Sequence, residues 1–282
     1  EWAIVDGLRA VAQFSNHNRH SRSHFFVKNN PTTGTNIRPT KEAFTETNRM
    51  DFQTYLNWKK TFAEDHNIDV VAGYDYMKDK NNSIDARVQG AASDKIPTLN
   101  VGTSNITNYP TSTRTDEVLI SYFGRVNYNF REKYLLSFTM RADGSSKFAA
   151  GNRWGYFPAA SAGWIVDEEA FWPRNKVVSS LKLRASYGLT GNNGIGLYDT
   201  YGSYNSAYQY NGMSTTTTGE MPNSNLTWES TTQVNAGLDM GLADDRVRVS
   251  FDYYDKVTRN LLFDVTLPNT TGYGSVVSNV GK

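Results

Sequence analysis

The chain contains no cysteine, so disulfide frameworks, thiolate metal sites and cysteine nucleophiles are all excluded. A chain without cysteine also suits a protein that crosses an oxidising periplasm without disulfide bonds. There is no run of about 18 consecutive apolar residues, which excludes a transmembrane helix. Barrel strands of roughly 10 alternating residues would give the same low mean hydropathy of -0.57, so a membrane barrel stays open.

The chain also lacks a large net charge and recognisable catalytic motifs. A formal net charge of +1 provides no basic excess, which argues against a nucleic-acid partner. The chain has no Gly-x-Ser-x-Gly elbow, no His-Glu-x-x-His and no phosphate loop, and residues 167–169 (DEE) read as a solvated turn rather than an acid/base pair. We therefore expect neither an enzyme nor a cofactor, and a hydrolase is only the third choice.

What the chain has in abundance is aromatic side chains and alternating strands. It carries 17 Tyr, 14 Phe and 6 Trp, a heavy load for a polar chain. Residues 118–130 and 134–143 alternate apolar and polar on both sides of a tight turn at 131–133. Because successive strand side chains point to opposite faces, this pair predicts a sheet with one apolar and one polar surface.

The same period of two recurs along the chain. We expect strands near residues 7–15, 48–59, 66–76, 118–130, 134–143, 154–166, 181–190, 231–242, 246–258 and 275–281. Short turns at 61–65, 131–133 and 243–245 alternate with longer connections at 16–45, 90–115 and 191–228. Such alternation predicts an all-β, antiparallel up-and-down meander, whose recurrent charges on the polar face would line a hydrated lumen.

A soluble alternative uses the same pattern. Sandwiches and propellers pack the apolar face inward, and a soluble or secreted β-rich glycan-binding module would show identical alternation. Aromatic residues near strand ends favour the transmembrane barrel, because they match the interfacial girdle of outer-membrane barrels. These residues are Tyr128, Phe130, Tyr134 and Trp164.

Several segments resemble the barrel of SusC/RagA-type TonB-dependent transporters. The resemblance rests first on residues 121–128 (SYFGRVNY), 133–136 (KYLL), 141–148 (RADGSSKF), 152–159 (NRWGYFPA) and 163–164 (GW). It continues at 181–188 (LKLRASYG), 190–192 (TGN), 226–229 (LTWE), 235–239 (NAGLD), 252–256 (DYYDK), 271–272 (TG) and 279–281 (NVG), and weakly at 62–67 (FAEDHN).

The resemblance implies a location and partners that the pattern alone does not give. Members import oligosaccharides or oligopeptides through the outer membrane, with a SusD-like lipoprotein as a lid and energy from the TonB complex. Their 22-stranded barrel carries a plug, which lies N-terminal to it. About ten strands fit in this chain, so we expect residues 1–282 to be part of the barrel domain, without the plug or the TonB-contacting segment.

Two sets of residues are candidates for contact with substrate. The charged positions Arg125, Arg141, Arg184 and Asp239 fall on the polar face and are expected to face the lumen. The loop at 191–228 is too long to serve only as a hairpin turn, and its tyrosines could stack on sugar rings or peptide side chains. Tyr201, Tyr204, Tyr208 and Tyr210 are the predicted binding residues of this loop.

Three histidines form the remaining cluster. His17, His20 and His24 have spacings that would align imidazoles on a helix, where they could hold a metal. Their Asn and Ser neighbours indicate a solvated loop or strand extension instead, so no metal site is predicted. The alternative of a basic, pH-sensitive loop near lipopolysaccharide phosphates has support as weak as that for a metal site.

Two further positions carry conformational predictions. Gly144 is expected in a turn, because glycine tolerates positive φ and the flanking Asp143 and serines bond to nearby amides. Pro158 lacks an amide proton, which predicts a bulge or bend within residues 155–163.

Overall fold

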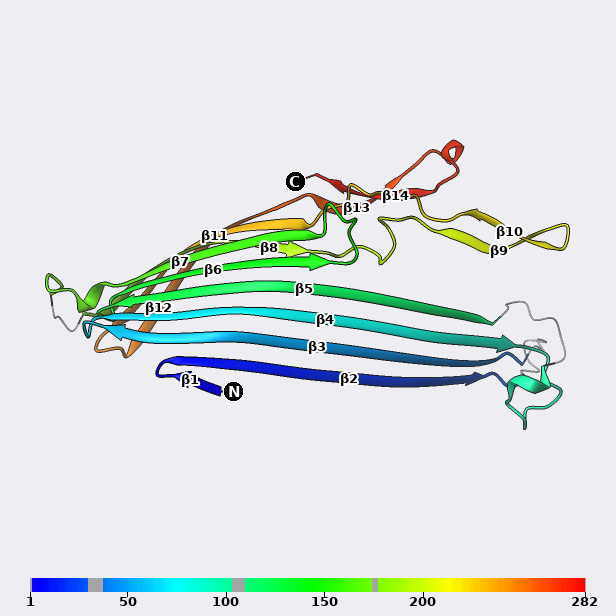
Figure 1. The fold of residues 1–282 in the computed structure, drawn as a ribbon, viewed down its shortest axis with the longest axis horizontal. Coiled ribbons are helices and arrows are strands. Elements are labelled where there is room, and N and C mark those ends of the chain that lie inside the picture. The colour runs from blue at the N-terminus through cyan, green and yellow to red at the C-terminus, as the bar shows by residue number, and fades with distance from the viewer. Residues whose placement is uncertain (1, 30–37, 103–109, 174–176, 282) are drawn as a thin grey trace. The chain divides into compact units, whose positions relative to one another are not determined.

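The computed structural model describes residues 2–29, 38–102, 110–173 and 177–281, apart from the side chains of residues 101, 207, 208 and 214. One ten-stranded antiparallel sheet dominates it, and each strand pairs with the next in the chain except that β11 follows β8 (Figure 1). Its strands are β1 (Trp2–Val5), β2 (Leu8–Phe26), β3 (Thr40–Phe62), β4 (His66–Val88), β5 (Thr111–Phe130), β6 (Tyr134–Ser145), β7 (Trp154–Ile165), β8 (Val178–Asn192), β11 (Glu229–Leu242) and β12 (Val247–Arg259).

Two smaller hairpins accompany the sheet. β9 (Tyr204–Tyr210) pairs with β10 (Met213–Thr218), and β13 (Leu261–Thr266) pairs with β14 (Ser275–Val280). Short 3-10 turns lie at η1 (Leu99–Val101), η2 (Val166–Glu168) and η3 (Asn269–Thr271). Within the described ranges, no helix is long and apolar enough to cross a membrane.

The predicted antiparallel meander is confirmed. β5 and β6 pair without interruption from Leu119 opposite Ser145 to Phe130 opposite Tyr134. The short turns are built alike: Ala63 and Glu64, Arg131 and Glu132, and residues 243–245 all have positive φ. Left-handed turn residues match the twist of the flanking strands, so these turns connect neighbouring strands directly without glycine.

The expected long connections contain more strand than the pattern indicated. Most of residues 16–45 belongs to β2 and β3, and the connection at 191–228 contains the β9–β10 hairpin. Likewise, the expected strand at 275–281 pairs in the β13–β14 hairpin rather than in the large sheet. The strands missed in these connections are held by backbone pairing and need no apolar face, so a search for alternating hydrophobicity does not detect them.

The turn predicted at Gly144 and the bulge predicted at Pro158 are both wrong. Gly144 lies inside β6 and pairs with Trp154; a Cβ there would come within 3.0 Å of the Trp154 ring, so glycine makes room for the indole. Pro158 pairs opposite Met140 of β6 in regular register, and no bulge interrupts that pairing. The pairing of β7 with β8 instead begins at Ala159, immediately after the residue that lacks an amide proton.

The chain divides into two compact units, which we describe separately. Unit 1 comprises residues 1–13, 52–76 and 118–282, and unit 2 comprises residues 14–51 and 77–117. In unit 1 the apolar face of the sheet is exposed: Leu136, Phe138 and Phe251 are 51%, 52% and 66% accessible. A soluble sandwich would bury this face, whereas a membrane wall presents it to lipid.

Aromatic rings gather at two levels of that apolar face. At the short-turn end, ring centroids follow one another from His66 to Phe130 (4.7 Å), Tyr134 (6.0 Å), Trp164 (6.5 Å) and Phe171 (6.3 Å), and we name these residues the short-turn belt. Further along the strands, Tyr122 lies 5.3 Å from Tyr74 and 5.9 Å from Trp154, and these three form the long-loop belt.

The spacing of the two belts matches a bilayer. Phe130 lies eight residues after Tyr122, and Tyr134 lies ten residues before Gly144, the partner of Trp154. At about 3.3 Å per residue and a strand tilt of roughly 40°, these intervals correspond to a height of about 20 to 25 Å along the membrane normal. That height is close to the apolar band of outer-membrane barrels.

Candidate functional site

The polar face of unit 1 is hollowed. A pocket of about 710 Å³ is lined by residues from all eight strands β3 to β8, β11 and β12, so the polar side is the concave one. Its lining combines amides, hydroxyls and both signs of charge, and it is open to water. We call it the polar pocket, and its main polar side chains are Lys59, Asp69, Asn127, Ser137, Lys182, Arg184, Asn235 and Asp252.

An arginine joins three strands at this pocket. Arg184 on β8 donates from Nε to Asp239 Oδ2 over 2.7 Å and from Nη2 to Asp239 Oδ1 over 3.0 Å. The same Nη2 lies 3.0 Å from Asp252 on β12. Asp239 also accepts a hydrogen bond from Ser250. Two predicted site residues, Arg184 and Asp239, therefore form one network on the polar face.

Gly237 makes this network possible. It lies directly opposite Arg184 on β11, and a Cβ added to it would stand 2.8 Å from Arg184 Cζ and 2.7 Å from Asp252 Oδ1. The guanidinium crosses the backbone at Gly237 to reach Asp239, which is two residues further along. Sequence reasoning missed this role, although the NAGLD segment that contains Gly237 carried part of the family resemblance.

The other two predicted arginines differ from each other. Arg141 donates to Ser121 Oγ and Asp143 Oδ1, both over 2.7 Å, and its guanidinium lies 5.9 Å from the centroid of the Phe123 ring. Arg125 is exposed and makes no ion pair with any residue that the structure describes. Because it is uncommitted, Arg125 is the stronger candidate to meet an anionic solute.

The connection at 191–228 is a folded platform. Phe148 and Leu226 are completely buried with Ile195, and Trp228, Leu262 and Val277 pack against them. Asn223 Nδ2 donates to the Val277 carbonyl over 2.8 Å, and Asn279 Nδ2 donates to the Thr227 carbonyl over 2.9 Å. These contacts fasten the β13–β14 hairpin to the connection, so the platform is held in place rather than free.

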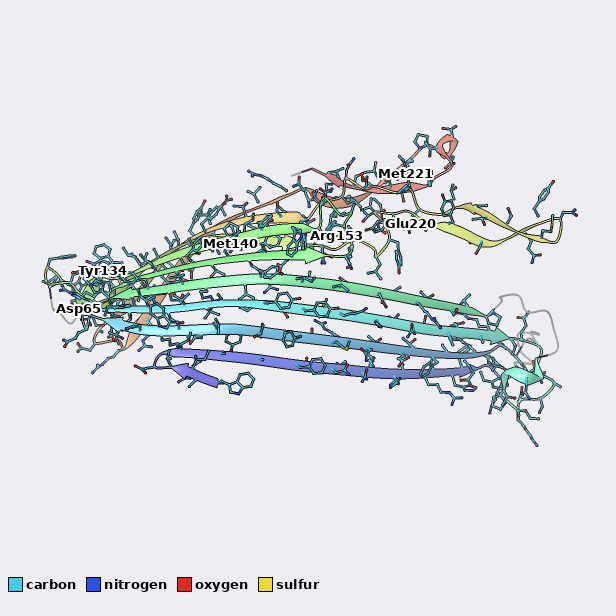
Figure 2. The ribbon with its side chains drawn as sticks, viewed as in Figure 1. Asp65, Tyr134, Met140, Arg153, Glu220 and Met221 are labelled. Atoms are coloured by element: carbon cyan, nitrogen blue, oxygen red, sulfur yellow. The ribbon has the colours of Figure 1, made fainter. Side chains whose placement is uncertain are left out.

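Three of the predicted loop tyrosines, Tyr201, Tyr204 and Tyr210, are exposed on this platform. Tyr204 and Tyr210 are 81% and 78% exposed on β9, and Tyr201 accepts a hydrogen bond from Arg153 Nη2 over 3.3 Å. Tyr208 occupies β9 opposite Thr215, and its side chain lies outside the described atoms. Figure 2 shows Arg153 and Glu220 at this end of the sheet, and Asp65 and Tyr134 at the short-turn end.

The acidic run at 167–169 is not simply solvated. Glu169 Oε1 accepts hydrogen bonds from the Tyr134 hydroxyl (2.5 Å) and the Trp164 indole (3.1 Å), and Asp167 Oδ1 accepts one from the Leu181 amide (2.8 Å). The Tyr134 and Trp164 bonds hold the pKa of the Glu169 carboxyl below its usual 4.5. On the platform, burial and the neighbouring Asp199 raise the pKa of Glu220.

The histidine cluster does not assemble. All three residues lie on β2, where strand alternation puts His17 on one face and His20 and His24 on the other. His24 Nδ1 lies 2.6 Å from Glu42 Oε1, and His20 stacks on Phe44 at 6.1 Å. Among the described residues, no three His, Asp or Glu side chains are arranged to hold a metal ion.

Comparisons with known proteins agree with this architecture. The family model "TonB dependent receptor-like, beta-barrel" matches residues 1–282. TonB-dependent receptor P3 of Formosa agariphila is 34% identical over 292 residues, covering 100% of this chain and 28% of that protein. TonB-dependent receptor SusC of Bacteroides thetaiotaomicron is 41% identical over 180 residues, covering 61% and 18%.

The solved structures give the same result. The RagAB peptide importer in its "closed-closed" state superposes with a TM-score of 0.89 at 27% identity, covering 99% of this chain and 31% of that one. The chain therefore spans less than a third of the length of these relatives. The exposed apolar face, its aromatic belts and these matches together show that the chain belongs to the TonB-dependent receptor β-barrel family, of the SusC/RagA type, and resides in the cell outer membrane.

Proposed function

We propose that this chain forms part of the wall of an active importer, which takes oligosaccharides or oligopeptides through the outer membrane. The concave polar pocket carries the proposal, because a hydrated, charged inner surface suits passage of polar solutes. Support for the peptide class comes from the similar structure named RagAB peptide transporter, and the oligosaccharide class is what the resemblance to SusC/RagA-type transporters implies. In this proposal the chain transports its substrate and does not catalyse a reaction.

The proposed partners follow from the same relatives. A SusD-like lipoprotein would cover the platform from outside, where Tyr201, Tyr204 and Tyr210 are exposed and could contact either lipoprotein or substrate. Energy would come from the TonB complex, through parts of the whole protein beyond these 282 residues. The plug would likewise belong to those other parts, so residues 1–282 would act only as barrel wall.

The test uses the complete receptor in cells. Uptake of labelled oligosaccharide and oligopeptide pools is measured with and without TonB, together with lipoprotein co-purification. We expect one pool to accumulate only when TonB is present. Uptake that persists without TonB, or hydrolysis of a pool by the purified receptor, would contradict the proposal.

A charge variant connects uptake to the polar face. Arg125→Gln removes an uncommitted cation there and should change the uptake of charged substrates relative to neutral ones. Arg246→Gln is the matched control, because Arg246 is an exposed arginine next to the short turn at 243–245. If the two variants took up charged and neutral substrates in the same ratio, Arg125 would not contact the transported solute.

A further inference from the structure

A lysine lies between two aromatic residues near the short-turn end of β3. Lys60 Nζ is 5.5 Å from the centroid of the Phe62 ring, and the Phe62 ring makes an edge contact with Trp58 at 6.1 Å between centroids. The ammonium thus extends toward Phe62, the last residue of β3. Lys60 is exposed, and its charge has no counter-ion within the described ranges.

Strand alternation puts the Lys60 side chain on the lipid-facing side of the sheet. Its neighbour Lys59 binds Asp69 over 3.1 Å, and Thr61 donates to Asn67 over 2.7 Å. These four residues line the polar pocket, so the residue between Lys59 and Thr61 points to the opposite face. Lys60 borders the same pocket as their neighbour in the strand, but only the Lys59 ammonium reaches a carboxylate there.

The short-turn belt lies on the same face as Lys60. His66 precedes Asn67 by one residue and so faces away from the polar pocket, and its ring lies 4.7 Å from the Phe130 ring. A second cation covers that ring: Arg131 Cζ is 5.1 Å from the Phe130 centroid, while its Nε lies 2.9 Å from Asp65 Oδ2. The two cations lie at β3 and at the end of β5, which flank β4 about 10 Å apart. All of these residues belong to unit 1.

This position is unfavourable for Lys60 without an anion. An ammonium at the edge of the hydrocarbon layer is costly unless it reaches water or an anion, and long lysine side chains extend toward the interface for that reason. Glu64 and Asp65 are the carboxylates nearest to it in sequence, and both lie in the short turn after β3. Asp65 is held by Arg131, and Glu64 forms no ion pair with Lys60 in the described structure.

Lipid phosphates are found at the level of the short-turn belt. Aromatic belts mark the edge of the hydrocarbon layer, and the headgroups begin immediately beyond it. The short turns of outer-membrane barrels face the periplasm, so this belt borders the periplasmic leaflet. We propose that Lys60, with Arg131 across β4, binds the phosphate of a glycerophospholipid in that leaflet. The inference concerns the lipid-facing surface of the wall and does not depend on the imported substrate.

The probe is phosphatidylglycerol added to the complete receptor in zwitterionic detergent, with binding followed by native mass spectrometry. Diacylglycerol with the same acyl chains is a parallel arm, which separates recognition of the phosphate from recognition of the chains. A cation near the membrane surface is worth about a 5-fold change in affinity, so Lys60→Gln should bind phosphatidylglycerol about 5-fold more weakly. Lys60→Gln/Arg131→Gln should bind it roughly 25-fold more weakly. Diacylglycerol binding should be the same in all three proteins.

Two controls protect the interpretation. Lys59→Gln removes the neighbouring ammonium from the opposite face and should leave phosphatidylglycerol binding unchanged. Lys60→Arg keeps the charge and should retain binding, which separates an electrostatic effect from a folding defect. Undiminished phosphatidylglycerol binding by Lys60→Gln, an equal loss in Lys59→Gln, or the same loss with diacylglycerol would overturn the proposal. A loss of lipid A binding in Lys60→Gln that exceeds the loss of phosphatidylglycerol would also overturn it, because the site would then belong to an outer-leaflet lipid.

Discussion

Arg184 and Asp239 form a two-point ion pair although they are not opposite each other in the sheet. The partner of Arg184 is Gly237 and the partner of Asp239 is Lys182, so the guanidinium reaches its carboxylate diagonally, 2.7 and 3.0 Å away. The glycine opposite Arg184 leaves the space for this path. The charge network of the polar pocket therefore depends on a residue that carries no charge.

Gly237→Ala should consequently break this ion pair. A Cβ at Gly237 displaces the Arg184 guanidinium, and losing the two-point pair should lower the free energy of unfolding by about 1 kcal/mol. Urea unfolding of the complete receptor in detergent measures the change. Gly163→Ala is the control, because its Cβ would meet nothing closer than 3.5 Å. Equal effects of both substitutions would show that Gly237 has no special role.

The orientation of the two faces predicts opposite responses at neighbouring positions. Phe138 is 52% exposed on the apolar face, and Phe138→Arg should destabilise the barrel by about 2 to 4 kcal/mol near the midplane. Thr139→Arg places the charge on the polar face beside Arg125 and should cost much less. Unfolding in lipid vesicles measures both, and spin labels at the two sites report their surroundings. A label at 139 in lipid and one at 138 in water would reverse the assignment.

Acid should loosen the connection between β7 and β8. Tyr134 and Trp164 hold the pKa of the Glu169 carboxyl below 4.5, so their bonds stabilise the fold above that pH and are lost as pH falls through the lowered pKa. The protection of the amides of residues 166–173 against hydrogen exchange, relative to an unfolded chain at the same pH, should therefore fall below about pH 4.5. Glu169→Gln should remove this pH dependence. If Glu169→Gln kept the same pH dependence of exchange, Glu169 would not be the group that causes it.

Shortening the platform hairpin tests the role of its tyrosines. Replacing residues 207–219 with a tight turn removes most of β9 and β10 but leaves the Phe148, Ile195 and Leu226 core intact. We expect normal barrel assembly with weaker lipoprotein association or uptake. Co-purification and transport at wild-type levels would mean that the hairpin only shields the barrel mouth.

The sheet has open edges at β1 and β12, which predicts how residues 1–282 behave alone. Unpaired backbone groups cost several kcal/mol each inside a bilayer, so the isolated segment should not form a stable monomeric pore. Heat-modifiability on gels after refolding into detergent provides the measurement. A heat-resistant, monodisperse barrel made from these residues would disprove the expectation.

The sequence by itself determined most strands of the large sheet and the side on which their residues fall, but it missed β1 and wrongly counted residues 275–281 among them. Alternation along 118–143 is a local property, since every second side chain of a strand shares a face, and it located Arg125, Arg141, Arg184 and Asp239 on the polar surface. The same rule failed for residues 16–45, because strands with two polar faces are held by backbone pairing and lack the hydrophobic period.

Only the tertiary structure decided which of those residues act together. The diagonal contact of Arg184 with Asp239 across Gly237 depends on the register between β8 and β11, and the bonds of Glu169 to Tyr134 and Trp164 depend on the path of a connection. Curvature of the sheet made the polar face concave and gathered side chains from eight strands around one pocket. These relationships join residues distant in sequence, so no local pattern encodes them, and geometry in three dimensions determines the site.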